Sequence, residues 1–226
     1  MKRREAAITA LVLVLSVVLA WAFWNAFSGP TGDRLAELTA TRVPESGVTN
    51  PVTAVLLNFR AYDTLLELAV LLAAILGIWA VGKASPGFLP AGAVLRALVG
   101  LIVPLLIIAG GYMLWVGGHA PGGAFQAGAL LGAAGVTLRL AGYPAAGLPP
   151  EALLRVTIGL GVLIFTLCGV ALMALGYGFL TYPLDLAKWL ILVIETAATL
   201  SIGATLAAAY LGGRADPTDS GDGVTR

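Results

Sequence analysis

The chain has 226 residues, of which 59% are hydrophobic and only 11% charged, and its mean hydropathy is +0.94. Soluble domains carry roughly 45–50% apolar and about 25% charged residues, so an ordinary soluble protein is excluded. The 13 Lys and Arg residues balance 12 Asp and Glu residues, which excludes the basic surface of a nucleic-acid-binding protein. One histidine and one cysteine cannot supply the ligands of a zinc, haem or iron–sulfur site, so we expect no metal and no cofactor.

Six apolar stretches are each long enough to cross roughly 30 Å of hydrocarbon. They lie at 6–27, 63–82, 93–116, 124–142, 152–178 and 186–211. The first follows three basic residues, as the apolar part of a signal peptide does, but it is long for a signal peptide and ends in aromatic residues typical of a membrane interface. We therefore expect an uncleaved anchor and an all-α integral membrane protein with about six transmembrane helices.

The basic residues predict how these spans are oriented, because cytoplasmic loops are enriched in Lys and Arg. With a cytoplasmic N-terminus, the inner side carries Lys2, Arg3, Arg4, Lys83, Arg96, Arg139, Arg155, Arg214 and Arg226. The outer side then carries only Arg34, Arg42, Arg60 and Lys188. This asymmetry predicts that both termini are cytoplasmic.

The longest connection, 28–62, begins polar and turns apolar, and Pro51 suits the start of a short interfacial helix in its second half. The later spans are joined by shorter loops. We therefore expect three parts: a two-span segment with an extracytoplasmic loop at 1–90, a four-span domain at 91–212, and a flexible cytoplasmic tail at 213–226.

Three charged residues at the start of the second span lie on one helix face, because Arg60, Asp63 and Glu67 are three and four residues apart. Glu67 lies roughly 6 Å deeper than Asp63 at 1.5 Å per residue. A charge inside hydrocarbon costs at least about 2–3 kcal/mol, so it needs a partner or a function. Two interpretations stay open: an interfacial Arg–Asp pair with Glu67 reaching back to water, or a Glu67 that titrates on a proton or sodium path.

The last span repeats the pattern with Lys188 and Glu195, which are seven residues, or two helical turns, apart. Glu195 lies roughly 10 Å deeper on the same face. A carboxyl group at that depth can hardly face lipid, so it is either a structural group bonded to a neighbouring helix or part of an ion path. Glu195 is the strongest single functional candidate in the chain.

The segment Gly-Gly-His-Ala-Pro-Gly-Gly-Ala-Phe-Gln, residues 117–126, separates the third and fourth spans. Pro121 suits the first turn of a helix, and the glycines permit a tight reversal. No strand precedes the segment and no Lys-Ser or Lys-Thr follows it, so it does not predict a nucleotide-binding loop. His119 alone is either an interfacial hydrogen-bonding residue or a proton shuttle. A helix-packing face is predicted by Gly128, Gly132 and Gly135.

This segment resembles the hallmark of the B subunit (MnhB/MrpB type) of Mrp multisubunit cation/proton antiporters, in which a Gly-His-x-Pro-Gly-Gly-Gly-Phe-Gln pattern opens a helix in a four-span protein. Here Ala124 replaces the third glycine. The stretch 47–67 resembles the MbhE-like segment that ends the large A subunit of those antiporters and is separate in related membrane-bound hydrogenases. That segment commonly has Asp where this chain has Asn58, so a role of that carboxylate does not carry over. The residues of the two motifs are Arg60, His119, Pro121, Gly122, Gly123, Phe125 and Gln126.

The resemblance implies a multi-pass subunit of a cation/proton antiporter in the cell (inner) membrane, without a catalytic site. Its partners would be the other subunits of the complex, the bilayer, and Na+ or H+. It points to a polar path made of Asp63, Glu67 and, through a looser motif, Lys188. Two alternatives stay open: the same module in the membrane arm of a complex I-related redox or inorganic-carbon-uptake complex, and a purely structural scaffold. The copurifying chains would separate the first two, and neutralising Glu67 and Glu195 would test the third.

Overall fold

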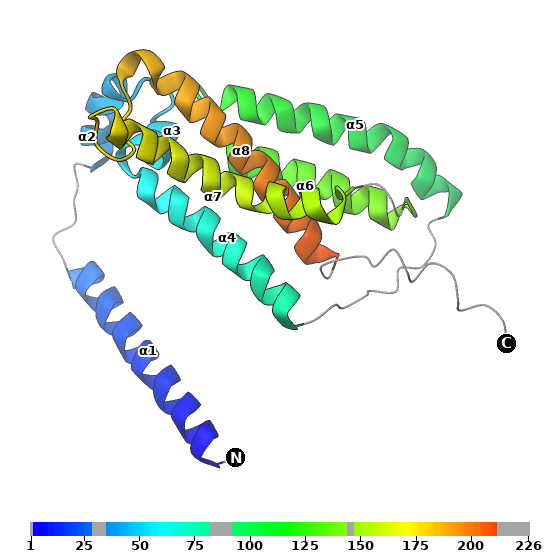
Figure 1. Ribbon diagram of the computed structural model, residues 1–226, viewed down its shortest axis with the longest axis horizontal. Helices are drawn as coiled ribbons and strands as arrows, with labels where there is room; N and C mark the ends of the chain where they lie inside the picture. The colour runs from blue at the N-terminus through cyan, green and yellow to red at the C-terminus, as the bar shows by residue number, and fades with distance from the viewer. Residues whose placement is uncertain (1, 29–34, 82–91, 144–146, 212–226) are drawn as a thin grey trace. The chain divides into compact units, whose positions relative to one another are not determined.

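The computed structural model describes residues 2–28, 35–81, 92–143 and 147–211 (Figure 1). The predicted tail at 213–226 lies outside these residues. The chain divides into two compact units, Met1–Leu38 and Thr39–Arg226, which are described separately.

The described residues form helices and turns without a strand. In chain order the elements are α1 (Lys2–Ser28), α2 (Leu35–Arg42), η1 (Val43–Ser46), α3 (Pro51–Ala54), η2 (Val55–Phe59), α4 (Ala61–Val81), α5 (Ala93–Val116), α6 (Ala124–Leu140), α7 (Glu151–Ala174) and α8 (Leu184–Tyr210). Within the described residues, α1, α4, α5, α7 and α8 are long and apolar enough to cross a membrane, and α6 is a shorter apolar helix of 17 residues. The predicted all-α membrane protein with about six transmembrane helices is confirmed.

Helix α1 belongs to the first unit and contains the apolar stretch Ala6–Ser28. Its 23 residues extend about 35 Å at 1.5 Å per residue, enough to cross the hydrocarbon region.

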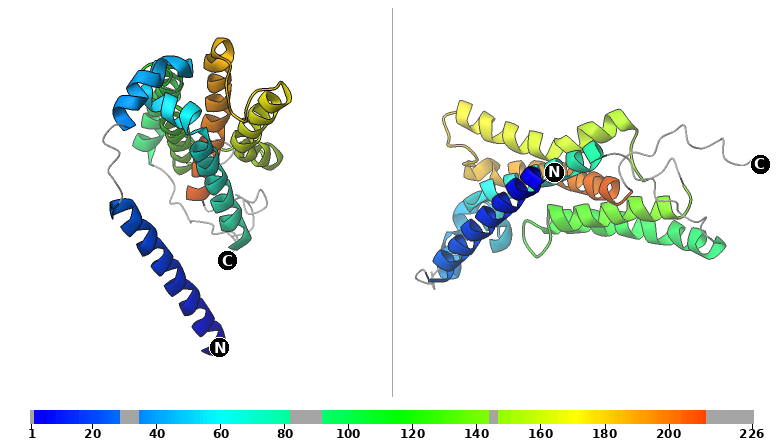
Figure 2. Two further views of the ribbon diagram at one scale, coloured as in Figure 1. Left: turned by 90° about the vertical axis from the view of Figure 1, so that its left-hand side faces the viewer. Right: turned by 90° about the horizontal axis from the view of Figure 1, so that it is seen from below.

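Helix α8 is the central helix of the second unit. It packs against α6 and α7 and also contacts α4 and α5. Figure 2 shows α8 between α7 on one side and the α5–α6 pair on the other. In the most apolar stretch of α8, 61% of the residues are buried inside the protein, against 17–28% in the corresponding stretches of α4, α5 and α7. A carboxyl group on the buried face of α8 is therefore placed inside the protein rather than against lipid.

Small residues let α6 approach α8 closely. A Cβ added to Gly128 would lie 2.7 Å from the Cβ of Ile202, and one on Gly132 would lie 3.2 Å from the Cβ of Leu206. Gly135 instead faces the backbone of Gly147, whose carbonyl oxygen would lie 2.5 Å from an added Cβ. The predicted helix-packing role of these glycines agrees with this geometry.

Gly128→Ala is expected to lower the melting temperature of the purified protein in detergent, measured by scanning fluorimetry. The added Cβ would overlap Ile202, and overpacking of this kind costs about 1–3 kcal/mol. The matched control is Gly111→Ala in α5, where an added Cβ meets nothing within 4 Å. That control should leave the melting temperature unchanged or raise it, because Ala favours a helix over Gly by about 0.5–1 kcal/mol. Equal losses in both variants would contradict the assigned packing.

Three connections meet at one end of the second unit: the segment before α4, the α5–α6 loop and the α7–α8 connection (Figure 1). The backbone N–H groups of Thr49 and Asn50 donate to the carbonyl oxygen of Gly118, both at 3.1 Å. Val48 packs in the same apolar cluster as Tyr182 of the α7–α8 connection. These three connections precede α4, α6 and α8. If successive helices cross a membrane in alternating directions, all three connections lie on the same side of it.

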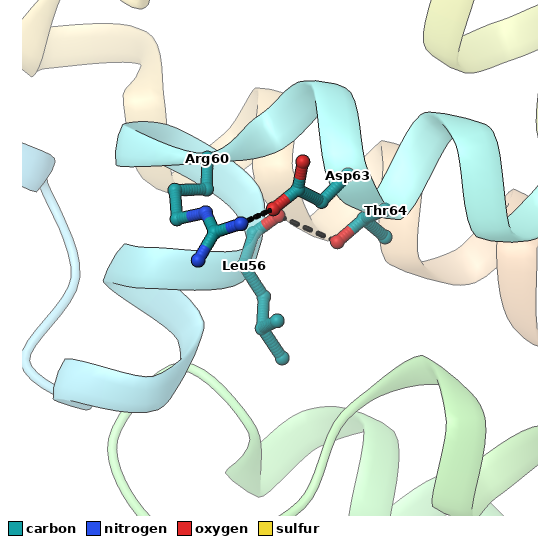
Figure 3. A network of polar contacts seen from close by, with 4 residues as sticks. All are labelled: Leu56, Arg60, Asp63 and Thr64. Atoms are coloured by element: carbon teal, nitrogen blue, oxygen red, sulfur yellow. Dashed lines mark hydrogen bonds and ion pairs between the residues drawn. The ribbon is translucent and has the colours of Figure 1, made fainter. Parts of the chain in front are cut away.

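A short helix follows Pro51, as predicted, but it passes directly into a π-helical turn, η2. The Asn50 side chain caps it by accepting a hydrogen bond from the N–H of Val52 at 3.1 Å. At the junction with α4, the Thr64 hydroxyl donates to the carbonyl oxygen of Leu56 at 2.7 Å, and Arg60 pairs with Asp63 (Figure 3). The helix face that carries Asp63 is thus joined to the turn that precedes it.

Candidate functional site

Glu195 lies on the buried face of α8 and is only 4% exposed. Its carboxylate packs against bare backbone, because Oε1 would lie 2.9 Å from a Cβ added to Gly123 and 3.4 Å from one added to Gly117. The backbone of Ala124, the first residue of α6, is its hydrogen-bond partner. The buried carboxylate therefore faces the N-terminal end of α6, where unpaired N–H groups and the helix dipole favour negative charge.

The carboxylate of Glu195 opens into a small cavity of about 30 Å³, which we call the Glu195 cavity. Lys188 and His119 also line it, so the structure adds His119 to the pair of residues that the sequence placed on one helix face. A space of this size holds at least one water molecule. Its other lining residues are Val48, Trp115, Gly118, Ile191 and Leu192.

Lys188 is exposed, and its Nζ atom lies 5.8 Å from the centroid of the Trp189 ring. The ammonium group is thus stabilised by the aromatic face. His119 is also exposed, and its Nδ1 atom lies 3.3 Å from the carbonyl oxygen of Val116. The Glu195 cavity is therefore lined by one buried acid and by two exposed basic residues.

Two glycines, Gly122 and Gly123, come directly before α6. Gly123 has φ +114°, a conformation that L side chains rarely adopt, and its N–H donates to the carbonyl oxygen of Met113 at 2.8 Å. A Cβ on Gly122 would lie 2.6 Å from the same carbonyl oxygen. Pro121 was expected in the first helical turn, but α6 begins at Ala124, so Pro121 lies in the preceding loop. The loop between α5 and α6 therefore folds back against the carbonyl group of Met113, and a side chain at Gly122 would prevent this contact.

The loop beside the cavity is held by residues of the front segment. The Nδ2 atom of Asn50, which is 4% exposed, donates to the carbonyl oxygens of Gly117 at 2.8 Å and Ala120 at 2.9 Å. The Thr53 hydroxyl donates to the carbonyl oxygen of Gly117 at 2.5 Å. We call Thr49, Asn50 and Thr53 the loop clamp. Sequence reasoning missed its role: Asn50 before Pro51 signals a helix cap, but not a partner 67 to 70 residues away.

Asp63 and Glu67 line a different and larger space. This groove, which we call the Glu67 groove, has a volume of about 750 Å³ and lies between α4, α6 and α8. Its remaining lining is apolar: Leu66, Val70, Leu71, Phe125, Ala129, Ile202 and Leu206. It shares no lining residue with the Glu195 cavity. The structure therefore does not join Glu67 and Glu195 in one path.

The remaining motif residues have separate places. Arg60 forms the ion pair with Asp63, as one of the two interpretations expected, and Phe125 packs against the main apolar core. Gln126 is exposed on the first turn of α6. Asn58 donates from Nδ2 to the carbonyl oxygen of Ser46 at 3.0 Å, a bond that a carboxylate at this position could not donate.

Among the described residues, no group of three or more His, Cys, Asp or Glu side chains is placed to hold a metal ion. The Glu195 cavity is accordingly a site with one acid, one imidazole and one amine. Such a set can exchange protons through a water molecule.

Comparison with known proteins identifies the family of this chain. The model of the domain related to the MnhB subunit of Na+/H+ antiporters matches residues 94–211, more than half of the chain. The chain belongs to the MnhB family. The front of this MnhB-family chain, residues 1–93, matches the model of MbhE, a component of MBH. Among curated proteins, none matches the sequence significantly.

Two solved structures resemble this MnhB-family protein. One is a chain of the Mrp complex from Dietzia sp. DQ12-45-1b, with 24% identity and a TM-score of 0.65. The alignment covers 99% of this chain but 27% of that one, so this protein spans about a quarter of its length. The other belongs to the membrane-bound sulfane sulfur reductase (MBS), an archaeal respiratory membrane complex, with 25% identity, a TM-score of 0.67, and coverage of 94% of this chain and 98% of that one.

Proposed function

We propose that this protein is a membrane subunit of a multisubunit Na+/H+ antiporter, where it contributes to ion translocation and to assembly and has no catalytic site of its own. The observation that carries the proposal is the buried carboxylate of Glu195, which shares a cavity with Lys188 and His119 in a chain of the MnhB family. A buried acid in a membrane helix needs a function or a partner, and ion transfer supplies the function.

The proposed partners are the other subunits of such a complex, in the cell (inner) membrane. Lys188 and Glu195 would serve one ion path, and Asp63 and Glu67 would serve a second polar region. We further propose that 1–90 and 91–212 act as two blocks with 213–226 as a tail. The loop clamp supports an interdependence of these blocks, because residues of the first hold a loop of the second.

A second candidate function is the same module in a redox-driven membrane complex. The alignment with the MBS chain favours it, since the two chains match over nearly their full lengths. The two candidates differ in composition: a redox complex contains metal clusters and a hydrophilic arm, and an antiporter does not.

The test is purification of the complex through a tag on this chain, followed by transport assays in inverted membrane vesicles. We expect only membrane subunits to copurify, and we expect deletion of the chain to abolish Na+-dependent proton movement. Copurifying iron–sulfur subunits would favour the redox candidate. Normal proton movement in vesicles that lack the chain would contradict both.

The orientation is tested by cysteine labelling at Glu45, in a Cys168→Ala background that removes the single native thiol. Glu45 is exposed and lies beside the connections that meet at one end of the second unit, whereas the adjacent Ser46 is completely buried. A membrane-impermeant maleimide should label Glu45→Cys from the outer side of intact cells. Labelling only after the cytoplasmic side is opened would reverse the predicted topology.

A further inference from the structure

We propose that the Glu195 cavity carries protons and excludes Na+, so that sodium crosses the complex elsewhere. This inference rests on the proposed function, because it names the ion for a site already assigned to ion translocation. It follows from the oxygen atoms, the charges and the space around the Glu195 carboxylate.

A sodium site needs several oxygen ligands, and in membrane transporters unwound carbonyls and helix C-terminal ends supply them. The end of α5 and the loop after it offer such carbonyls, and five of them accept a hydrogen bond from the protein. The loop clamp donates to three of them, and backbone N–H groups of the loop itself donate to the other two. The five are the carbonyls of Met113, Val116, Gly117, Gly118 and Ala120. Among the described residues that line the cavity, Glu195 is the only one whose side chain carries oxygen.

The charges around the carboxylate also disfavour a metal cation. The N-terminal end of α6, at Gly123 and Ala124, faces the carboxylate with its positive dipole end. Half-helix N-termini are the places where transporters bind anionic groups, not sodium. Lys188 of the same helix also lines the cavity, and its ammonium group lies over the Trp189 ring. A Na+ ion at Glu195 would therefore meet the positive end of the α6 helix.

The groups that face Glu195 are sufficient for a proton. Lys188 comes from α8 and His119 from the α5–α6 loop, while α5 contributes the uncharged Trp115 and the front segment contributes the uncharged Val48. The cavity of about 30 Å³ has room for a water molecule, which can hydrogen-bond to the acid. A proton that reaches this water adds to a carboxylate oxygen, and when the carboxyl group ionises the proton returns to water, with no change in ligands.

Infrared titration of the purified complex in lipid nanodiscs tests this inference. The protonated form of Glu195 contributes a carboxyl C=O stretch, which is assigned by its loss in Glu195→Gln. If the Gln variant fails to assemble, Glu195→Asp keeps the acid and moves the band, which gives the same assignment. The titration is run in NaCl and in choline chloride at equal ionic strength.

We expect one midpoint in both salts, because Na+ does not bind at the carboxylate. Competition would lower the midpoint by up to about one pH unit for each tenfold rise in Na+, and that shift would overturn the proposal. The absence of any titrating band that depends on Glu195 would also overturn it. Failure of the proposed function has a different signature, namely normal transport in vesicles that lack the chain.

Discussion

Replacement of Glu195 by Gln is expected to reduce ion exchange by the complex on the order of tenfold or more while the complex still assembles. Gln keeps the size of the side chain and its hydrogen-bonding capacity but removes the group that accepts a proton. Because Glu195 is the only acid lining its cavity, no neighbouring carboxylate can replace it. Sodium- or potassium-dependent proton movement in inverted vesicles gives the rate, and a native gel gives the yield of the complex.

A matched control lies at the next position of α8. Thr196 is exposed, and its hydroxyl donates to the carbonyl oxygen of Leu192 in its own helix at 2.7 Å, so Thr196→Val should transport normally. Glu195→Ala removes packing as well as charge, and it should lower the yield in addition to the rate. Full activity in Glu195→Gln and Glu67→Gln, alone and combined, would leave the scaffold interpretation in place of the ion path.

Asn50→Asp is expected to destabilise the purified protein by about 1–3 kcal/mol, because the carbonyl oxygen of Ala120 is left without its donor, whereas that of Gly117 keeps the hydrogen bond from Thr53. A carboxylate cannot donate to the carbonyl oxygens of Gly117 and Ala120, and it places negative charge beside them. It still accepts the hydrogen bond from Val52, so the helix cap survives and the loss reports the loop clamp alone. Scanning fluorimetry in detergent measures the fall in melting temperature.

The control for the clamp is Thr49→Val. Thr49 is exposed, and its hydroxyl lies 3.4 Å from the carbonyl oxygen of Gly118, a long hydrogen bond whose loss should change stability by less than about 0.5 kcal/mol. Its backbone N–H, which also bonds Gly118, is unaffected by the substitution. A melting temperature of Asn50→Asp equal to that of Thr49→Val would show that the buried amide does not hold the loop.

The sequence by itself determined the features that depend on neighbours within a few turns. Apolar runs of about 20 residues predicted the membrane helices, and Pro51 marked the start of a short helix that the structure confirms. The seven-residue spacing of Lys188 and Glu195 predicted a shared face, and both do line one cavity. These predictions succeed because helix periodicity and capping are local properties of the chain.

Only the tertiary structure decided which of these local features meet. It placed His119 beside Glu195, and it separated Glu195 from Glu67 by assigning them to different spaces. It also revealed that Asn50 holds a loop about 70 residues further along. In a membrane, lipid and protein neighbours are similarly apolar, so the pattern of a helix shows that it spans the bilayer but not which helix it packs against. That choice depends on small residues such as Gly128 and on buried hydrogen bonds, whose partners exist only once the helices have assembled.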